Sequence, residues 1–212
     1  TEISEEWEEK IAGWLKDFKK IAVREYHGVD ILKRMGFDGC WVLDPVFLLP
    51  IEKWKEIMTP VNNKEPYLLV YDFESNKEIE RFCKEYAKKN GLKIYSINDT
   101  YPRLYADKNF SSAGPREFLS LIYHCDAFVS NSFHGTAFSI IFGKPVFVFN
   151  RNRHKVNSRM ESLTKMFGIE ECIVPEGFTI DKYAEMKFDF EKINNIRVEK
   201  LEVSEKFLNE LL

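Results

Sequence analysis

One stretch of this 212-residue chain constrains its fold more than any other, the segment DAFVSNSFHGTAFSIIFGKPVFVF at Asp126–Phe149. It combines a short apolar strand, a polar turn, a helix and a second apolar strand. Asn131 and Ser132 are residue types that cap helices, so we expect a helix from there to about Phe142. His134 then lies in the first helical turn. The segment therefore predicts one strand–helix–strand unit of a parallel sheet.

The chain from Pro66 onward repeats this alternation of strands and helices. Such alternation is typical of a parallel sheet whose strands are joined by crossover helices. We therefore expect an α/β fold with a Rossmann-like parallel sheet and crossover helices. Ser75 and Glu78 predict a capping box at the start of a helix that ends at Asn90. The polar stretch Asn98–Ser112 predicts a loop.

A helix is also predicted near the N-terminus, where Ser4 can cap it and acidic side chains suit its positive end. Its apolar residues recur at helical spacing and are Trp7, Ile11, Trp14 and Phe18. This spacing predicts one buried helix face, so core packing is the role that we expect for the tryptophans.

Composition limits the classes of function. The chain has 31 basic and 34 acidic residues and a net charge of -3, which gives no electrostatic footprint for nucleic acid. Its four cysteines show no CxxC or Cys/His ligand spacing, so we expect no metal site. The same spacing indicates no disulfide framework, which is consistent with a reducing cytoplasm. The longest apolar stretch, Ala137–Phe149, is interrupted and too short to cross a bilayer, so we expect at most a peripheral association with the membrane.

The polar turn before the motif helix is the best candidate for a functional site. A helix that begins at the end of a parallel strand directs free N–H groups and a partial positive charge into the crevice above the sheet. Anions bind in such crevices. Gly135 lacks a side chain, so we expect a ligand to approach the backbone closely there. The alternative is that His134 is only a hydrogen-bonded histidine near a helix end.

This segment resembles the polysaccharide pyruvyl transferase family. The resemblance is carried by the SFHG element at 132–135, by GPREFLSLI at 114–122 before it, by VRE at 23–25 and by VLDPVFLL at 42–49. It spans roughly Lys20 to Gly168.

The family has two Rossmann-like halves arranged as in GT-B glycosyltransferases, with the active site in the cleft between them. The resemblance implies that residues 1–50 are a remnant of the N-terminal half with the inter-domain link. Residues 51–212 are then the C-terminal Rossmann-like domain, the C-terminal half of a GT-B-like two-domain architecture. Because the chain begins with Thr1 rather than methionine, we expect it to be a trimmed or mature fragment.

The resemblance implies an enzyme that transfers the pyruvyl unit of phosphoenolpyruvate to two hydroxyls of a sugar, as a ketal, in cell-surface or exopolysaccharide biosynthesis. Phosphoenolpyruvate is then the donor substrate, no cofactor is needed, and the acceptor is a glycan or a lipid-linked sugar. The donor carries a phosphate and a carboxylate, so the site needs cationic side chains and helix-start amides. Proton transfer requires a group that titrates near neutral pH, as histidine ordinarily does. His134 is therefore the expected general acid or base.

The predicted substrate-binding residues lie at strand ends and helix starts. Arg24, in VRE, is expected to bind an anion, and a structural salt bridge with Glu25 or another carboxylate is the alternative. Glu117 is expected to accept hydrogen bonds from hydroxyl groups of the acceptor sugar. The alternative is that the carboxylate only interacts favourably with the dipole at the helix start. The full set is Arg24, Arg116, Glu117, Asn131, Ser132, Gly135 and Arg159.

The motif departs from one branch of the family, in which it reads arginine-leucine-histidine. In this chain the three positions are occupied by Ser132, Phe133 and His134. The arginine that could bind an anion through two hydrogen bonds is therefore missing. The basic run at 151–155, RNRHK, can supply the charge or can be an exposed loop.

Two other functions stay open at this point. One is a GT-B-type glycosyltransferase that uses a nucleotide sugar, although no glutamate stands where such a domain usually holds the donor ribose. The other is a non-catalytic carbohydrate-binding homologue.

Overall fold

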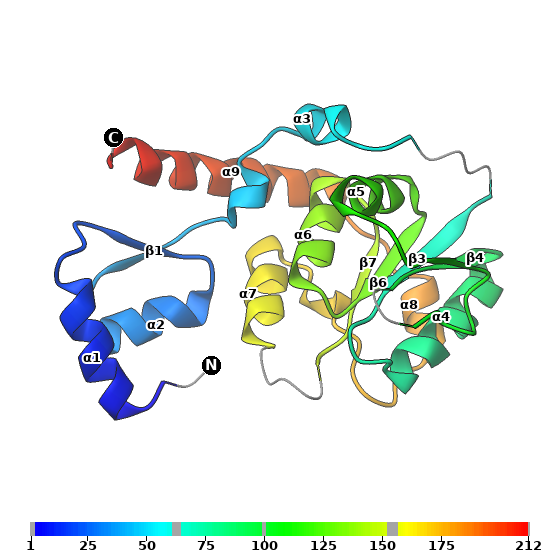
Figure 1. Ribbon diagram of the computed structural model, residues 1–212, viewed down its shortest axis with the longest axis horizontal. Coiled ribbons are helices and arrows are strands. Elements are labelled where there is room, and N and C mark those ends of the chain that lie inside the picture. Colours follow the sequence, from blue (N-terminus) through cyan, green and yellow to red (C-terminus); the bar gives the residue numbers. More distant parts are fainter. Residues whose placement is uncertain (1–2, 61–64, 99–100, 152–156, 212) are drawn as a thin grey trace.

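The computed structural model describes residues 3–60, 65–98, 101–151 and 157–211. Two parallel sheets organise these residues, a two-stranded sheet near the N-terminus and a five-stranded sheet that follows it. Figure 1 shows the two sheets at opposite ends of the longest axis, with the C-terminal helix returning from the larger sheet toward the smaller one.

The smaller sheet pairs β1 (Ile21–Val23) with β2 (Gly39–Trp41), and helix α2 (Tyr26–Arg34) connects the two strands. Every residue of both strands is only partly buried. Helix α1 (Glu5–Leu15) lies beside α2, and Arg34 donates a hydrogen bond of 2.6 Å to Glu8.

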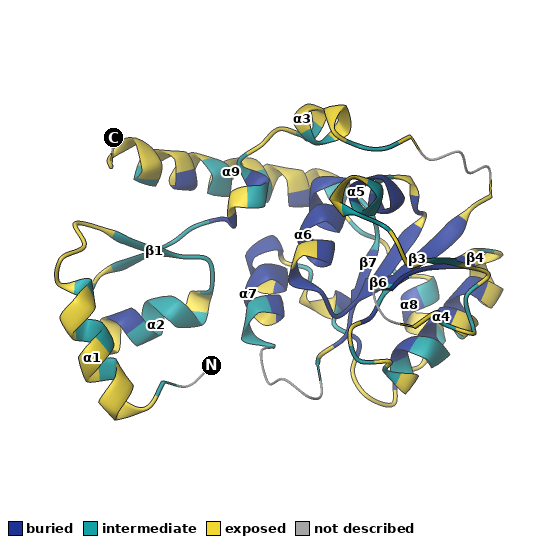
Figure 2. Cartoon of the chain, in the orientation of Figure 1, coloured by how far each residue is buried: buried dark blue, intermediate teal, exposed yellow. Residues whose placement is uncertain are grey.

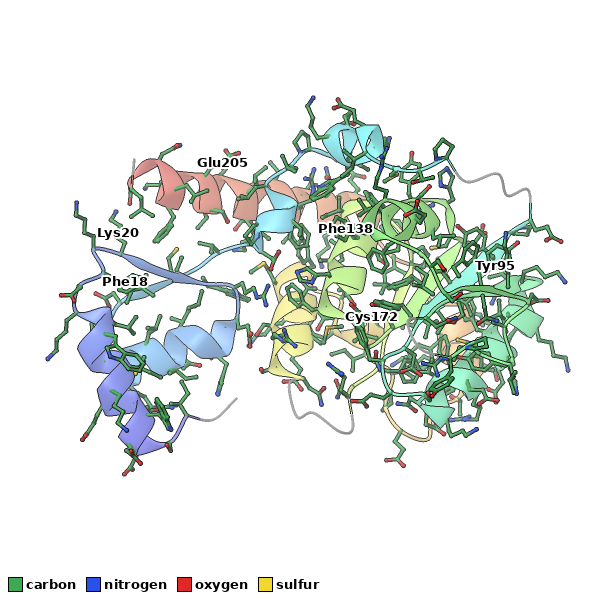
Figure 3. The ribbon with its side chains drawn as sticks, in the orientation of Figure 1. Phe18, Lys20, Tyr95, Phe138, Cys172 and Glu205 are labelled. Carbon is green, nitrogen blue, oxygen red and sulfur yellow. The ribbon has the colours of Figure 1, made fainter. Side chains whose placement is uncertain are left out.

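The predicted N-terminal helix exists as α1, but its predicted buried face does not. None of the residues of α1 is buried, and Trp7 and Trp14 are 50% and 62% exposed. Phe18, labelled in Figure 3, follows the helix and is exposed as well. Figure 2 shows α1 mostly in the colour of exposed residues. The helical spacing identifies an amphipathic surface, but the described residues cover it only in part, so Ile11 is partly buried and the two tryptophans are exposed.

The larger sheet has the strand order β5-β4-β3-β6-β7, and all neighbouring strands in it are parallel. Its strands are β3 (Tyr67–Tyr71), β4 (Lys93–Ile97), β5 (Lys108–Phe110), β6 (Ala127–Ser130) and β7 (Val146–Val148). The crossover helices are α4 (Lys77–Asn90), α5 (Pro115–His124) and α6 (Phe133–Ile141). The predicted α/β fold, with a Rossmann-like parallel sheet and crossover helices, is confirmed.

Both faces of the larger sheet are covered, as parallel sheets require. Successive side chains of a strand point to opposite faces, so β6 contributes to two cores. Phe128 packs in the core with residues of α5, α6 and α7 (Ser158–Phe167), whereas Val129 packs in the core with residues of α4 and α8 (Ile180–Ala184). Phe138 on α6, labelled in Figure 3, packs edge-on against Trp54 with 4.9 Å between the ring centroids.

The remaining elements join the two sheets. The link after β2 contains the 3-10 turn η1 (Pro45–Phe47) and helix α3 (Ile51–Glu56). A second 3-10 turn, η2 (Glu170–Cys172), precedes α8, and α9 (Phe190–Asn209) is the C-terminal helix. The hydroxyl of Ser204 on α9 accepts a hydrogen bond of 3.0 Å from the backbone N–H of Leu43. The C-terminal helix therefore holds the link in place.

Two local predictions are wrong. Strand β5 lies inside the stretch 98–112 that was predicted as a loop, and its strand conformation depends on pairing with β4. The residue that caps α4 is Asn76, whose Oδ1 accepts a hydrogen bond of 2.8 Å from the N–H of Glu78. Ser75 precedes the cap with a φ of 54°, in the left-handed region.

The strand order creates a topological switch point between β3 and β6. From β3 the chain continues to β4 and β5 on one side, whereas β6 and β7 lie on the other side. Ligand sites of open α/β sheets form at such a point, outside the carboxyl ends of the strands. Ser130 is the last residue of β6, so the polar turn of the motif begins at this switch point.

Gly135 has a packing role that the sequence did not indicate. A Cβ at this position would lie 2.7 Å from Cε1 and 2.8 Å from Cζ of Phe128, a ring that is fully buried. The missing side chain therefore faces the sheet, and it allows α6 to pack closely on β6. Close approach of a ligand to the backbone at Gly135 stays a prediction.

We expect Gly135→Ala to destabilise the fold by about 1–3 kcal/mol, because the added methyl group overpacks a buried ring. Denaturant unfolding measures this loss. The matched control is Gly13→Ala on α1, where a Cβ meets nothing within 4 Å. This control should be neutral or stabilising by up to about 1 kcal/mol, since alanine favours helix. Equal unfolding midpoints for both variants would show that the Phe128 contact does not constrain α6.

Candidate active site

The two strands at the switch point are joined by the side chain of Asn131. Its Nδ2 donates a hydrogen bond of 2.8 Å to Oδ1 of Asp72, and its Oδ1 accepts one of 3.1 Å from the N–H of Phe73. Asp72 and Phe73 follow β3 directly, and Asn131 follows β6. Asn131 is buried, and its amide holds the ends of β3 and β6 together. A direct contact of Asn131 with substrate stays a prediction.

The motif helix begins as expected, with Ser132 as its N-cap. The Ser132 hydroxyl accepts a hydrogen bond of 3.3 Å from the N–H of Gly135, and the carbonyl of Ser132 accepts one of 3.0 Å from the N–H of Thr136. Ser132 is itself buried. Its contacts fix the start of α6, and its predicted role in substrate binding stays a prediction.

His134 projects outward from the first turn of α6. Its side chain is 55% exposed, although the residues on either side of it are buried. Its Nε2 lies 4.0 Å from Oδ2 of Asp44, which is too long for a hydrogen bond. The imidazole is therefore available to a ligand.

Asp44 is the residue around which three distant segments meet. Its side chain is 3% exposed and forms an ion pair with Nη1 of Arg24, at the end of β1. Its Oδ1 accepts a hydrogen bond of 3.1 Å from the N–H of Val46, which fixes the turn η1. The Arg24 guanidinium also lies 4.7 Å from the centroid of the Phe133 ring, beside His134. Figure 1 places the link before α3 between the small sheet and α6, in agreement with these contacts.

The arrangement leaves hydrogen-bond donors free for an anion. Of the guanidinium nitrogens of Arg24, only Nη1 forms a hydrogen bond with a described residue, and the side chain is 34% exposed. The first N–H groups of a helix have no partner inside it. In α6 the cap satisfies the N–H of Gly135, whereas the N–H groups of Phe133 and His134 bond to no described residue.

Arg159 stands near this cluster but not in it. It lies in the first turn of α7, next to Ser158, whose hydroxyl donates a hydrogen bond of 3.1 Å to Glu25. The Arg159 side chain is partly exposed, and it forms no hydrogen bond or ion pair with a described residue. Its predicted role in binding stays a prediction.

Arg116 and Glu117 hold the link that follows α3. Nε of Arg116 donates a hydrogen bond of 2.7 Å to the carbonyl of Ile57, and the hydroxyl of Thr59 donates one of 2.8 Å to Glu117. This bond from Thr59 is the main reason why the pKa of Glu117 is lowered. The structure shows no contact between either residue and His134 among the parts of the chain that it describes. Their predicted role as ligands stays a prediction.

Only the first residue of the basic run at 151–155 can be placed. Nε of Arg151 lies 3.3 Å from Oε1 of Glu74, and the Arg151 guanidinium lies 5.1 Å from the centroid of the Phe73 ring. Its charge is therefore already paired. The rest of the run, 152–155, lies outside the described residues.

Asp44 is the site residue that the sequence analysis missed. Its signal was an acid between an apolar strand and a proline, in Val42-Leu43-Asp44-Pro45. Among the described residues, no group of three or more His, Cys, Asp or Glu side chains is arranged to hold a metal ion. Nor does any helix in these ranges combine the length and apolar character needed to cross a membrane.

Comparison with known proteins gives one family match. The family model described as polysaccharide pyruvyl transferase matches residues 3–153. No protein of curated function matches the chain.

Two solved structures align with the chain at low identity. The glycosyltransferase SnogD from Streptomyces nogalater is 13% identical with a TM-score of 0.42, and the alignment covers 85% of this chain and 59% of that one. The dodecameric iron-containing heptosyltransferase TibC, in complex with ADP-D-β-D-heptose, is 14% identical with a TM-score of 0.36, and the alignment covers 84% of this chain and 52% of that one. The chain thus spans between 52% and 59% of the length of these two structures.

Replacing Arg24 by alanine should destabilise the fold by about 1–3 kcal/mol, because the buried Asp44 carboxylate then lacks its charged partner. Equilibrium unfolding in urea measures the change. Lys10→Ala serves as the control, since Lys10 pairs with Glu6 at the surface, with side chains 49% and 74% exposed. Such exposed pairs contribute roughly 0–1 kcal/mol. Equal losses for the two variants would contradict a constraining role for the Arg24–Asp44 pair.

Thr59→Val should raise the pKa of Glu117 toward its usual value, because the hydroxyl that stabilises the carboxylate is removed. In the native protein the lowered pKa favours the folded state above the ordinary pKa of glutamate, and this contribution is lost as the pH falls through the lowered value. A side-chain carboxyl titration by NMR measures both pKa values. An unchanged pKa in Thr59→Val would rule out the Thr59 bond as the cause.

Proposed function

Because the chain belongs to the polysaccharide pyruvyl transferase family, we propose that it takes part in transferring the pyruvyl unit of phosphoenolpyruvate to two hydroxyls of a sugar, as a ketal. The observation that carries this proposal is the exposed imidazole of His134 at the start of α6, close to the Arg24–Asp44 pair. The site combines a group able to transfer a proton with donors able to hold an anion.

The donor phosphoenolpyruvate carries two anionic groups, a phosphate and a carboxylate. We assign one of them to the free N–H groups of Phe133 and His134, where the partial positive charge of α6 adds to the attraction. The other is assigned to the free side of the Arg24 guanidinium, whose planar fork suits either anion. Asp44 does not touch substrate in this scheme. It positions Arg24, and it neutralises part of the arginine charge.

The transfer needs two C–O bonds to form and one to break. A proton adds to the methylene carbon of the donor, which becomes a methyl group, and a sugar hydroxyl oxygen bonds to the neighbouring carbon and loses its proton. A second hydroxyl then bonds to the same carbon while the bond from that carbon to the phosphate oxygen breaks. Inorganic phosphate leaves with the second hydroxyl proton. One donor and one diol thus yield one ketal and one phosphate.

His134 is the group that we assign to proton transfer. An exposed imidazole without a hydrogen bond can give a proton to the methylene carbon or take one from the attacking hydroxyl. The proposed setting is the cytoplasmic synthesis of a cell-surface glycan or exopolysaccharide, with a glycan or a lipid-linked sugar as the acceptor.

We expect His134→Ala to lower the rate of phosphate release from phosphoenolpyruvate by about 10² or more in the active protein, which is typical of the loss of a general acid or base. A panel of methyl glycosides serves as acceptor. The control is His124→Ala, because His124 lies at the end of α5 and bonds to the carbonyl of Ser120. Near-normal release by His134→Ala would refute the assignment. In a parallel thermal-shift series, stabilisation by UDP or GDP but not by phosphoenolpyruvate would favour a nucleotide-sugar transferase instead.

A further inference from the structure

A cavity lies between helices α2 and α7. Its volume is about 380 Å³, and the residues that line it are Tyr26, His27, Ser158, Glu161, Ser162 and Lys165. We call it the Tyr26 pocket. Its walls come from segments more than a hundred residues apart in sequence, one following β1 and the other packed on the larger sheet. Its size falls in the range of about 300–1,000 Å³ that is usual for small-molecule sites.

Hydrogen bonds between the two walls hold the pocket open at a fixed width. The backbone N–H of Tyr26 donates to the hydroxyl of Ser162 at 3.2 Å, and the hydroxyl of Ser158 donates to Glu25 at 3.1 Å. The Tyr26 ring also packs edge-on against Trp41, with 5.8 Å between the ring centroids. The walls are therefore positioned before any ligand arrives.

Several polar groups of the pocket have no partner among the described residues. The imidazole of His27, the carboxylate of Glu161 and the hydroxyl of Tyr26 form no hydrogen bond or ion pair with any residue that the structure describes. The ammonium of Lys165 lies 4.4 Å from the centroid of the Tyr26 ring, and it too lacks an ion pair in the described ranges. These groups are free to bind a ligand.

The chemistry of these groups suits a neutral polyol. A carboxylate accepts hydrogen bonds from hydroxyls, whereas an ammonium and an imidazole donate them. One positive and one negative side chain nearly cancel, so the pocket has no net attraction for an anion. The exposed ring of Tyr26 offers an apolar surface to the C–H groups of a sugar ring, as aromatic side chains with a polar end do.

The position of the pocket matches the chemistry of the neighbouring site. Tyr26 lies two residues after Arg24, so their Cα atoms are separated by at most about 7 Å. The pocket therefore adjoins the segment that carries Arg24. We propose that the Tyr26 pocket binds the acceptor sugar, a single neutral hexose unit whose paired hydroxyls face the Arg24–His134 side. This inference rests on the proposed function.

Amide NMR spectra of the chain, titrated separately with methyl glycosides and with phosphoenolpyruvate, test this assignment. The probes are the methyl glycosides of glucose, galactose, N-acetylglucosamine and N-acetylmannosamine. We expect at least one of them to shift the amide signals of Tyr26, His27, Ser162 and Lys165. Phosphoenolpyruvate should instead shift the signals of His134 and Gly135.

Two variants and a control make the test specific. Tyr26→Ala should weaken glycoside binding at least tenfold. Glu161→Gln removes the charge of an exposed carboxylate that bonds to no described residue, and it should weaken glycoside binding at least about fivefold. Glu170→Gln, an exposed glutamate that does not line the pocket, should leave the affinity unchanged.

Failure of this proposal and failure of the proposed function give different results. If no glycoside shifts the pocket signals, or if Glu161→Gln and Glu170→Gln bind equally well, the Tyr26 pocket is not the acceptor site. If glycosides shift these signals but phosphoenolpyruvate leaves the amide signals of His134 and Gly135 unchanged, the Tyr26 pocket still binds the sugar. In that case phosphoenolpyruvate is not the donor.

Discussion

The buried carboxylate of Asp44 is the constraint on which the candidate site depends. A charge that is almost completely removed from water is costly unless it is paired and hydrogen-bonded, and Asp44 meets both needs through Arg24 and the N–H of Val46. The bonds join the end of β1 to the link after β2, and Arg24 in turn contacts Phe133 at the start of α6. The relative positions of Arg24 and His134 therefore follow from one ion pair.

Some polar residues of the motif hold the strand ends and the start of α6 in place, and others keep their side chains free. Asn131 joins the ends of β3 and β6, Ser132 caps α6, and Gly135 lets that helix approach Phe128. These contacts face inward. His134 points outward from the same turn, so the rigidity of its neighbours sets the direction of its imidazole. A single five-residue segment thus supplies both the scaffold and the proposed acid–base group.

The features that the sequence predicted well have local causes. Helix α6 begins at the Ser132 cap and α4 ends at Asn90, as expected, because caps and a terminating glycine are encoded nearby. The misses have distant causes. Strand β5 exists through pairing with β4, the role of Asp44 depends on Arg24 twenty positions earlier, and the exposure of the α1 tryptophans depends on what packs against them. Periodicity finds an amphipathic face, but it does not supply the partner of that face.

The central claim is that Arg24 and the start of α6 hold the donor beside His134. Diffraction from crystals of the protein soaked with phosphoenolpyruvate tests it most directly. The account predicts donor density with its anionic groups about 2.7–3.2 Å from the Arg24 guanidinium and the N–H groups of Phe133 and His134, and with its methylene carbon facing the imidazole. Well-ordered donor bound elsewhere, with the cluster around Asp44 unchanged and empty, would contradict it.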